Sequence, residues 1–157
     1  MGMVGVNMKD NIESFELLVA RIFEKLYRSF PKKVEVSPIE VVDHTPNGYW
    51  DDYGNFVDPL SHAEKALFHS TVQWLIDDGY VIGPLNRFIS SKITLSSKGL
   101  QTMQQDVSSS DVLSKRGSHL TKALADGNTD LAICIVSEAL GPEALKAGVT
   151  KTKCNCS

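Results

Sequence analysis

The chain has 157 residues, of which 42% are hydrophobic and 22% are charged, and its formal net charge at pH 7 is −3. This length is the usual size of one domain, which can bury a core without the help of disulfides or bound metal. The slightly acidic balance does not favour a general nucleic-acid binder, because such proteins usually carry a basic domain or face, although local patches matter more than the total charge.

The cysteines and the N-terminus bear on the compartment. Cys134, Cys154 and Cys156 are an odd, small set, and the first residues lack the charged and apolar regions of a secretory signal. We therefore expect a reducing compartment, the cytoplasm. Residues 1–10 are expected to form a disordered leader. No apolar run approaches the roughly 18 residues that a membrane span needs.

The first predicted element is an amphipathic helix over residues 12–29. Asn11 is placed to cap its start, and Pro31 to end it. Apolar residues recur every three or four positions and so form one stripe: Ile12, Phe15, Val19, Ile22 and Leu26. A line of cations on the same helix is interpreted as a solvated face in preference to a binding surface: Arg21, Lys25 and Arg28.

A short strand over residues 33–36 and a short helix over residues 38–42 are predicted next. Ser37 and Glu40 form a capping box at the start of that helix. Residues 43–60 then form a predicted loop, because they are rich in Pro, Gly, Asn and Asp. The loop carries four aromatic side chains: Tyr49, Trp50, Tyr53 and Phe56.

A second capping box, Ser61 with Glu64, predicts a helix from there to Asp78. Gly79 is placed to adopt the left-handed conformation that ends a helix. The following elements are a strand at residues 80–82, a turn at residues 83–86, a returning strand at residues 87–95 and, after the cap Ser96, a helix that carries Leu100 and Met103.

The C-terminal third is predicted to be helical. Residues 104–110 are polar and serine-rich, which indicates a linker. Two helices, over residues 112–125 and 130–140, and a short helical piece are expected to form an extension over residues 111–148. A flexible tail is expected over residues 149–157.

The predicted order (helix, strand, helix, helix, strand, turn, strand, helix) resembles the winged helix-turn-helix superfamily. Two stretches carry the resemblance: residues 68–82, which end in WLIDDGYVI, and residues 93–103, ITLSSKGLQTM. It implies an α+β, mainly helical fold, in which residues 11–105 form a winged-helix core of three helices and a small antiparallel β wing, with a C-terminal helical extension. The loop over residues 43–60 departs from the pattern, because a tight turn usually joins the second and third helices.

In winged helices that bind DNA, the resemblance implies that the third helix lies in the major groove and reads bases from its N-terminal half. We therefore expect a dimeric transcriptional regulator that binds double-stranded DNA. Its contacts are predicted on the third helix, at Lys65, His69 and Gln73, and around the wing, at Arg87, Lys92 and Lys98. The alternative for the helix residues is an exposed polar face, and Asp77 and Asp78 would repel phosphates if they faced them.

The alternative function is a winged-helix protein–protein interaction module that does not bind DNA. Exposed aromatic side chains favour contacts with partners, and the loop offers Tyr49, Trp50, Tyr53 and Phe56. The competing structural interpretation is that these side chains fold back and cover one end of the core.

Residues 131–136 are apolar around the whole helix, and such a helix must be covered on most sides. We expect a homodimer in which a partner subunit covers this helix at Leu131, Ile133, Ile135, Val136 and Leu140. The alternative is that the C-terminal helices pack on the first helix of the same chain. Cys134 lies in this apolar run and is expected in the core.

No sequence pattern predicts catalysis or a bound cofactor. The loop residues Asp51, Asp52, Asn55 and Asp58 lack the spacing of an EF-hand loop. Cys154 and Cys156 form a C-x-C pair without the further ligands of a zinc site. The chain holds no Walker loop, G-x-G-x-x-G or H-E-x-x-H motif, and none of its histidines is spaced for a catalytic triad. We therefore expect no enzyme activity, no metal and no cofactor.

Overall fold

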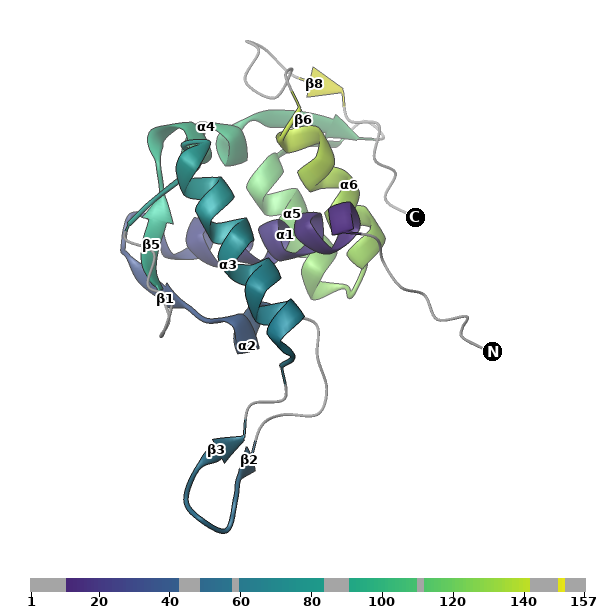
Figure 1. Cartoon of the computed structure of the whole chain (residues 1–157). Coiled ribbons are helices and arrows are strands. Elements are labelled where there is room, and N and C mark those ends of the chain that lie inside the picture. Colours follow the sequence, from purple (N-terminus) through teal and green to yellow (C-terminus); the bar gives the residue numbers. More distant parts are fainter. Residues whose placement is uncertain are drawn as a thin grey trace.

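The computed structural model describes residues 11–42, 49–57, 60–83, 91–109, 112–141 and 150–151. Within them the chain has the expected α+β fold, in which helices predominate over small sheets (Figure 1). The expectations for the leader, for residues 84–90 with Arg87, and for the last helical piece fall outside the described residues.

Apart from two strands within the predicted loop, the elements follow the predicted order as far as the fourth helix. The helices are α1 (Asn11–Ser29), α2 (Pro38–Val41), α3 (His62–Asp77), α4 (Ser97–Gln104), α5 (Arg116–Ala125) and α6 (Thr129–Ala139). The strands are β1 (Val34–Val36), β2 (Tyr49–Trp50), β3 (Phe56–Val57), β4 (Val81–Ile82), β5 (Ser91–Leu95), β6 (Asp106–Ser109), β7 (Val112–Lys115) and β8 (Thr150–Lys151).

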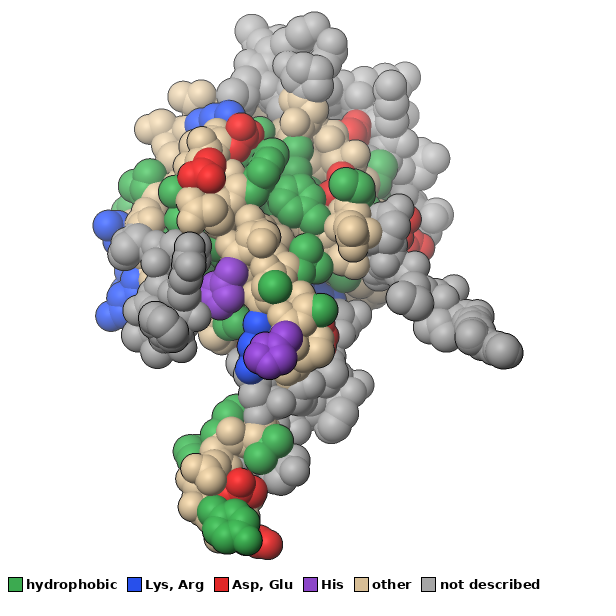
Figure 2. Space-filling model, in the orientation of Figure 1, with side chains coloured by type: hydrophobic (Ala, Val, Ile, Leu, Met, Phe, Trp, Pro, Cys, Tyr) green, Lys and Arg blue, Asp and Glu red, His purple; other side chains and the backbone are tan. Residues whose placement is uncertain are grey.

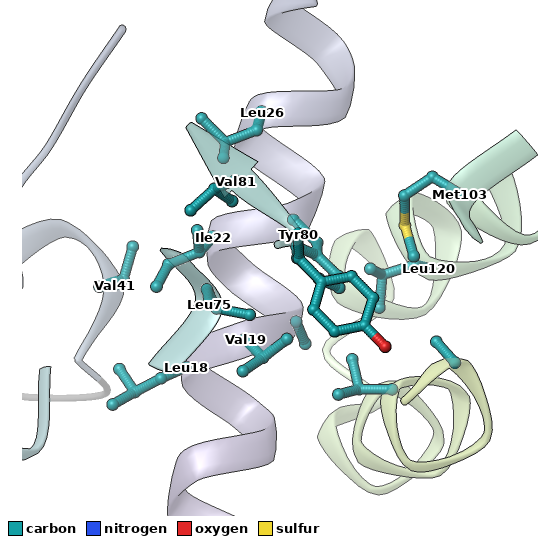
Figure 3. Packing of buried hydrophobic residues seen from close by; sticks show 14 of the residues in the cluster. Leu18, Val19, Ile22, Leu26, Val41, Leu75, Tyr80, Val81, Met103 and Leu120 are labelled. Atoms are coloured by element: carbon teal, nitrogen blue, oxygen red, sulfur yellow. The ribbon is translucent and has the colours of Figure 1, made fainter. Parts of the chain in front are cut away.

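Helix α1 forms the centre of the core, because it contacts α3, β5, α5 and α6. The predicted stripe is confirmed for Val19, Ile22 and Leu26, which are fully buried. Ile12 is 65% exposed instead, because it lies in the first turn at the end of the helix. Figure 3 shows buried side chains of α2, α3 and β4 on one side of α1, and those of α4 and α5 on the other.

Two local signals place α3 as expected. The hydroxyl of Ser61 accepts the N–H of Glu64 at 3.1 Å, and the Glu64 carboxylate accepts the N–H of Ser61 at 2.9 Å, which completes the predicted capping box. At the other end Gly79 has φ 83°, the left-handed conformation that ends a helix. The chain then enters β4 directly.

Strands β1, β5 and β4 form an antiparallel sheet in that order. The register pairs Val34 with Ile93 and Val81 with Leu95. Ile93, Leu95 and Val81 are buried, so one face of this small sheet joins the core around α1.

The C-terminal third differs from the prediction at its start. The predicted linker and the first turn of the predicted helix are strands β6 and β7, which pair Asp106 with Lys115 and Val107 with Ser114. Helix α5 begins at Arg116, and β8 pairs in parallel with β6 in the stretch predicted as a flexible tail. A short polar segment has no clear period, so only its pairing with distant residues decides that it forms strands.

The apolar helix α6 packs on α1 and α5 of the same chain. Leu131, Ile135 and Val136 are buried there, while Ile133 and Leu140 are half-buried. The alternative, that the C-terminal helices pack on the first helix of the same chain, is therefore confirmed for α6, and the homodimer stays a prediction.

Cys134 lies on α6, half-buried at the edge of the core, and takes part in a disulfide bond. Its place at the edge of the core agrees with the prediction, whereas the disulfide was not predicted from the sequence. The chain's other cysteines, Cys154 and Cys156, fall outside the described residues. Among the described helices, none combines the length and apolar character that a membrane span requires.

Candidate protein-binding surface

The predicted aromatic loop contains a β-hairpin that extends away from the helical body (Figure 1). Strands β2 and β3 pair Tyr49 with Val57 and Trp50 with Phe56. A hydrogen bond closes the turn between them: the carbonyl oxygen of Asp51 accepts the N–H of Gly54 at 3.1 Å. Gly54 has φ 81°, a conformation that glycine adopts without steric cost and that commonly follows the turn in short hairpins.

The side chain of Asp51 organises the tip of the hairpin. Its Oδ1 atom accepts the N–H of Asn55 at 2.8 Å and that of Tyr53 at 2.9 Å. These backbone hydrogen bonds, first that of Asn55, hold the pKa of the Asp51 carboxyl below its usual value. An isolated two-stranded hairpin is only marginally stable in water, so this carboxylate, ionised at neutral pH, supplies part of its order.

The aromatic side chains of the hairpin are exposed to solvent. Tyr53 is 90% exposed, Trp50 is 71% exposed and Phe56 is 48% exposed. The expectation that they cover one end of the core is therefore wrong. The rings of Trp50 and Phe56 meet edge to face with their centroids 5.4 Å apart, which leaves much of the indole open. The side chain of Tyr49 lies outside the described set.

The hairpin is acidic as well as aromatic. Residues 49–57 include Asp51 and Asp52 and contain no lysine, arginine or histidine. Figure 2 shows green hydrophobic and red acidic side chains together on the hairpin, at the foot of the molecule. Large exposed aromatics beside carboxylates, held on an ordered turn, are suited to contact with another protein.

The predicted DNA contacts on α3 do not form one basic face. Lys65 is half-buried in the first turns, and Gln73 donates to the Asp77 carboxylate at 2.8 Å. His69 is half-buried, with an Nδ1 atom that has no hydrogen bond within the described part of the chain. The exposed positions along the helix are His62 in its first turn and then mainly small or neutral residues: Ala63, Ala66, Ser70, Gln73 and Trp74, followed by Asp77.

Lys98, predicted as a phosphate contact, is engaged inside the fold. Its ammonium donates to the backbone oxygen of Asp78 at 2.8 Å, lies 3.7 Å from the Asp78 carboxylate and sits 4.3 Å from the centre of the Tyr80 ring. Lys65 and Asp78 are 13 residues apart along α3 and its cap, which is about 20 Å. Lys98 and Lys65 therefore belong to opposite ends of the helix. Lys92 is exposed on β5, opposite Glu35 of β1.

The cations of α1 are partly solvated, as expected, and Arg21 and Lys25 also contact α2. Arg21 donates to the carbonyl oxygen of Val41 at 3.1 Å, and Lys25 donates to the Glu40 carboxylate at 3.0 Å. Burial would raise the pKa of Glu40, but the Ser37 N–H and the Lys25 ammonium lower it overall. Arg28 pairs with a glutamate of its own helix. Most of the positive charge on this line of cations is therefore paired with groups of the same chain.

Sequence reasoning missed a buried polar junction between α4, α5 and α6. Arg116 is only 3% exposed and donates to the carbonyl oxygen of Thr102, in the last turn of α4, at 3.0 Å. Burial lowers the pKa of Arg116 and of His119, while the charge of Glu138 raises both. A cation at a helix C-terminus stabilises free carbonyls, so this junction has a structural role. No local pattern identifies it, because its members come from three helices.

Among the described residues, no group of three or more His, Cys, Asp or Glu side chains could hold a metal ion. The hairpin itself was detectable in principle, because aromatic pairs flank a turn that contains Asp and Gly.

Comparisons with protein-family models, with curated proteins and with solved structures found no significant match to this chain.

Proposed function

We propose that this chain is a protein-interaction module, in which a winged-helix-like body presents the hairpin β2–β3 to a protein partner. The observation that carries the proposal is the exposure of Trp50 and Tyr53, at 71% and 90%, on a turn that is ordered by Asp51. Leaving such side chains in water gains nothing for folding, whereas aromatics of this kind dominate the binding energy of interfaces.

The arrangement of the body supports its comparison with a winged helix. Strand β1 follows the first helix, and β4 and β5 follow the third, with the sheet order β1-β5-β4. The hairpin lies between α2 and α3, where a winged helix usually has a tight turn. Helix α3 begins a few residues after β3, at the capping box of Ser61 and Glu64.

Double-stranded DNA is the competing ligand, and the described surface favours it less. After His62 the exposed positions of α3 carry no cation, the helix ends in acidic residues, and Lys98 is engaged with Asp78. DNA binding draws its affinity from cations that neutralise phosphates, so a neutral reading helix would bind weakly. Lys92 is exposed on β5, but it lies opposite Glu35 of the neighbouring strand β1.

Site-specific photo-crosslinking in the cells that produce the chain tests the proposal. A benzophenone amino acid replaces Tyr53, with the same group at the exposed Ala125 of α5 as the matched control. We expect a discrete protein adduct from position 53 and none from position 125. Adding Trp50→Ala to the position-53 probe should reduce the adduct roughly 30-fold, the factor for about 2 kcal/mol of lost binding energy.

Two outcomes would contradict the proposal. One is the absence of a protein adduct at position 53 that exceeds the control. The other is binding to random duplex DNA that falls steeply with salt and weakens on Lys92→Glu, because that would make the α3 and wing side the functional surface. Circular dichroism of each variant verifies that the helical body is intact.

A further inference from the structure

We propose that the partner surface that receives the hairpin is a basic one: an apolar site on another protein, bordered by lysine or arginine side chains. This inference rests on the proposed function and specifies the chemistry of the partner. It follows from the charge and geometry of the hairpin alone.

The hairpin and the residues on either side of it carry only negative charges. From Thr45 to Ser61 the sequence contains Asp51, Asp52 and Asp58 and no lysine, arginine or histidine. An interface is selected for electrostatic complementarity, and like charges brought together at an interface cost several kcal/mol. A partner that buries Trp50 and Tyr53 must therefore tolerate or neutralise the neighbouring carboxylates, and a basic border does so.

The two carboxylates at the tip have different roles. Asp51 directs its Oδ1 atom at backbone N–H groups of the turn, so it shapes the hairpin. Asp52 is exposed, and it lies next to Tyr53, the most exposed aromatic side chain of those described. Asp52 is therefore the carboxylate that is placed to meet a cation of the partner, together with the neighbouring ring.

The same combination of groups occurs inside this protein. The Lys98 ammonium lies 4.3 Å from the centre of the Tyr80 ring and 3.7 Å from the Asp78 carboxylate. A cation gains from an aromatic face and a carboxylate at once, because the ring quadrupole and the negative charge attract it together. The hairpin offers the aromatic and acidic parts of this arrangement in Trp50, Tyr53 and Asp52, and it lacks the cation.

Two other occupants fit less well. A nucleic acid would bring phosphates to a hairpin without cations, although single strands do stack on aromatic rings in basic grooves. A second copy of the chain is the other possibility, because Phe30 is 37% exposed close to the exposed Lys32 and Lys33. This patch is short and the copies share a net charge of −3, so we favour a different protein.

The test uses the photo-crosslinking probe at position 53 in extracts, at graded ionic strength. We expect the adduct yield to fall about two- to five-fold on Asp52→Asn, the range for one exposed ion pair, and about tenfold or more on Asp52→Lys. The matched control is Glu35→Gln, which removes the same charge from an exposed position on β1 and should leave the yield unchanged. Raising the ionic strength from roughly 0.05 to 0.4 M should also lower the yield. Mass spectrometry of the adduct should map the contact to a peptide that contains lysine or arginine.

The outcomes separate this inference from the proposed function. The inference of a basic partner surface would be wrong if the adduct yield did not change with Asp52→Lys and with salt. It would also be wrong if the contact peptide contained no lysine or arginine. In both cases the hairpin would remain a docking element. An adduct with a second copy, lost on Lys32→Glu with Lys33→Glu, or an adduct with nucleic acid, would also overturn the inference. The absence of any adduct above the Ala125 control would overturn the proposed function itself.

Discussion

Replacing Gly99 with alanine tests how α4 is held against the strand β4. A Cβ atom on Gly99 would lie 2.2 Å from the carbonyl oxygen of Tyr80 and 3.1 Å from the Leu95 side chain. The first distance involves backbone, which cannot move aside as a flexible side chain can. The same oxygen accepts the N–H of Ser96 at 2.9 Å, so any retreat of α4 disturbs the bond that anchors its start.

The expected magnitude combines opposing effects. Overpacking costs about 1–3 kcal/mol, and weakening one hydrogen bond costs about 1 kcal/mol. Alanine gains about 1 kcal/mol over glycine in helix propensity, so the net loss of unfolding free energy is about 2 kcal/mol. For a protein of this size, that corresponds to a decrease in Tm of roughly 4–8 °C.

Urea and thermal denaturation followed by circular dichroism measure this loss, with Gln101→Ala as the control at an exposed position of the same helix. Helix propensity alone predicts that Gly99→Ala stabilises the protein, so the sign of the change decides between the two effects. A variant as stable as the wild type, or more stable, would refute the close approach of α4 to Tyr80.

Three further predictions concern the C-terminal helices. Arg116→Ala should lower the unfolding free energy by about 1–3 kcal/mol, because the buried carbonyl oxygen of Thr102 loses its hydrogen-bond donor, and a change below about 0.5 kcal/mol in urea denaturation would contradict this. Burial lowers the pKa of His119 from 6.5, so the folded state favours the neutral imidazole. The contribution of His119 to the unfolding free energy should be fully present above pH 6.5 and decrease as the pH falls below it, and His119→Gln should remove this part of the pH dependence. Non-reducing peptide mapping should find Cys134 linked to a peptide with Cys154 and Cys156, and reduction should lower the unfolding free energy by about 3 kcal/mol. Free thiols at all three positions would refute the last prediction.

Much of the fold was predictable, because its signals are local. The capping pair Ser61 and Glu64, the terminating Gly79 and the apolar stripe of α1 lie within a few residues of the contacts they make. Apart from the hairpin strands β2 and β3, which were predicted as loop, these signals place the elements up to α4 within a few residues of their observed bounds. The strands β6 and β7 were missed, since a short polar segment becomes a strand only through pairing, here between residues such as Asp106 and Lys115.

The candidate site was only half predictable. The sequence singles out Trp50 and Tyr53 as an unusual aromatic cluster, but whether such side chains face water or the core depends on what else is close enough to cover them. In the same way, the sequence alone predicts a DNA-binding surface at Lys65, Gln73 and Lys98. Their partners, such as Asp77 and Asp78, come from neighbouring turns and a neighbouring helix, and these partners neutralise the surface.

Helix caps, turns and apolar periodicity act over a few residues, so the helices up to α4 follow from local sequence. Which apolar surfaces are covered depends instead on the tertiary fold. The apolar helix α6 packs on α1 of the same chain, and the hairpin β2–β3 extends away from the body. Coverage is a property of elements far apart in the chain, so the surface that remains for function could be located only when all of them were in place.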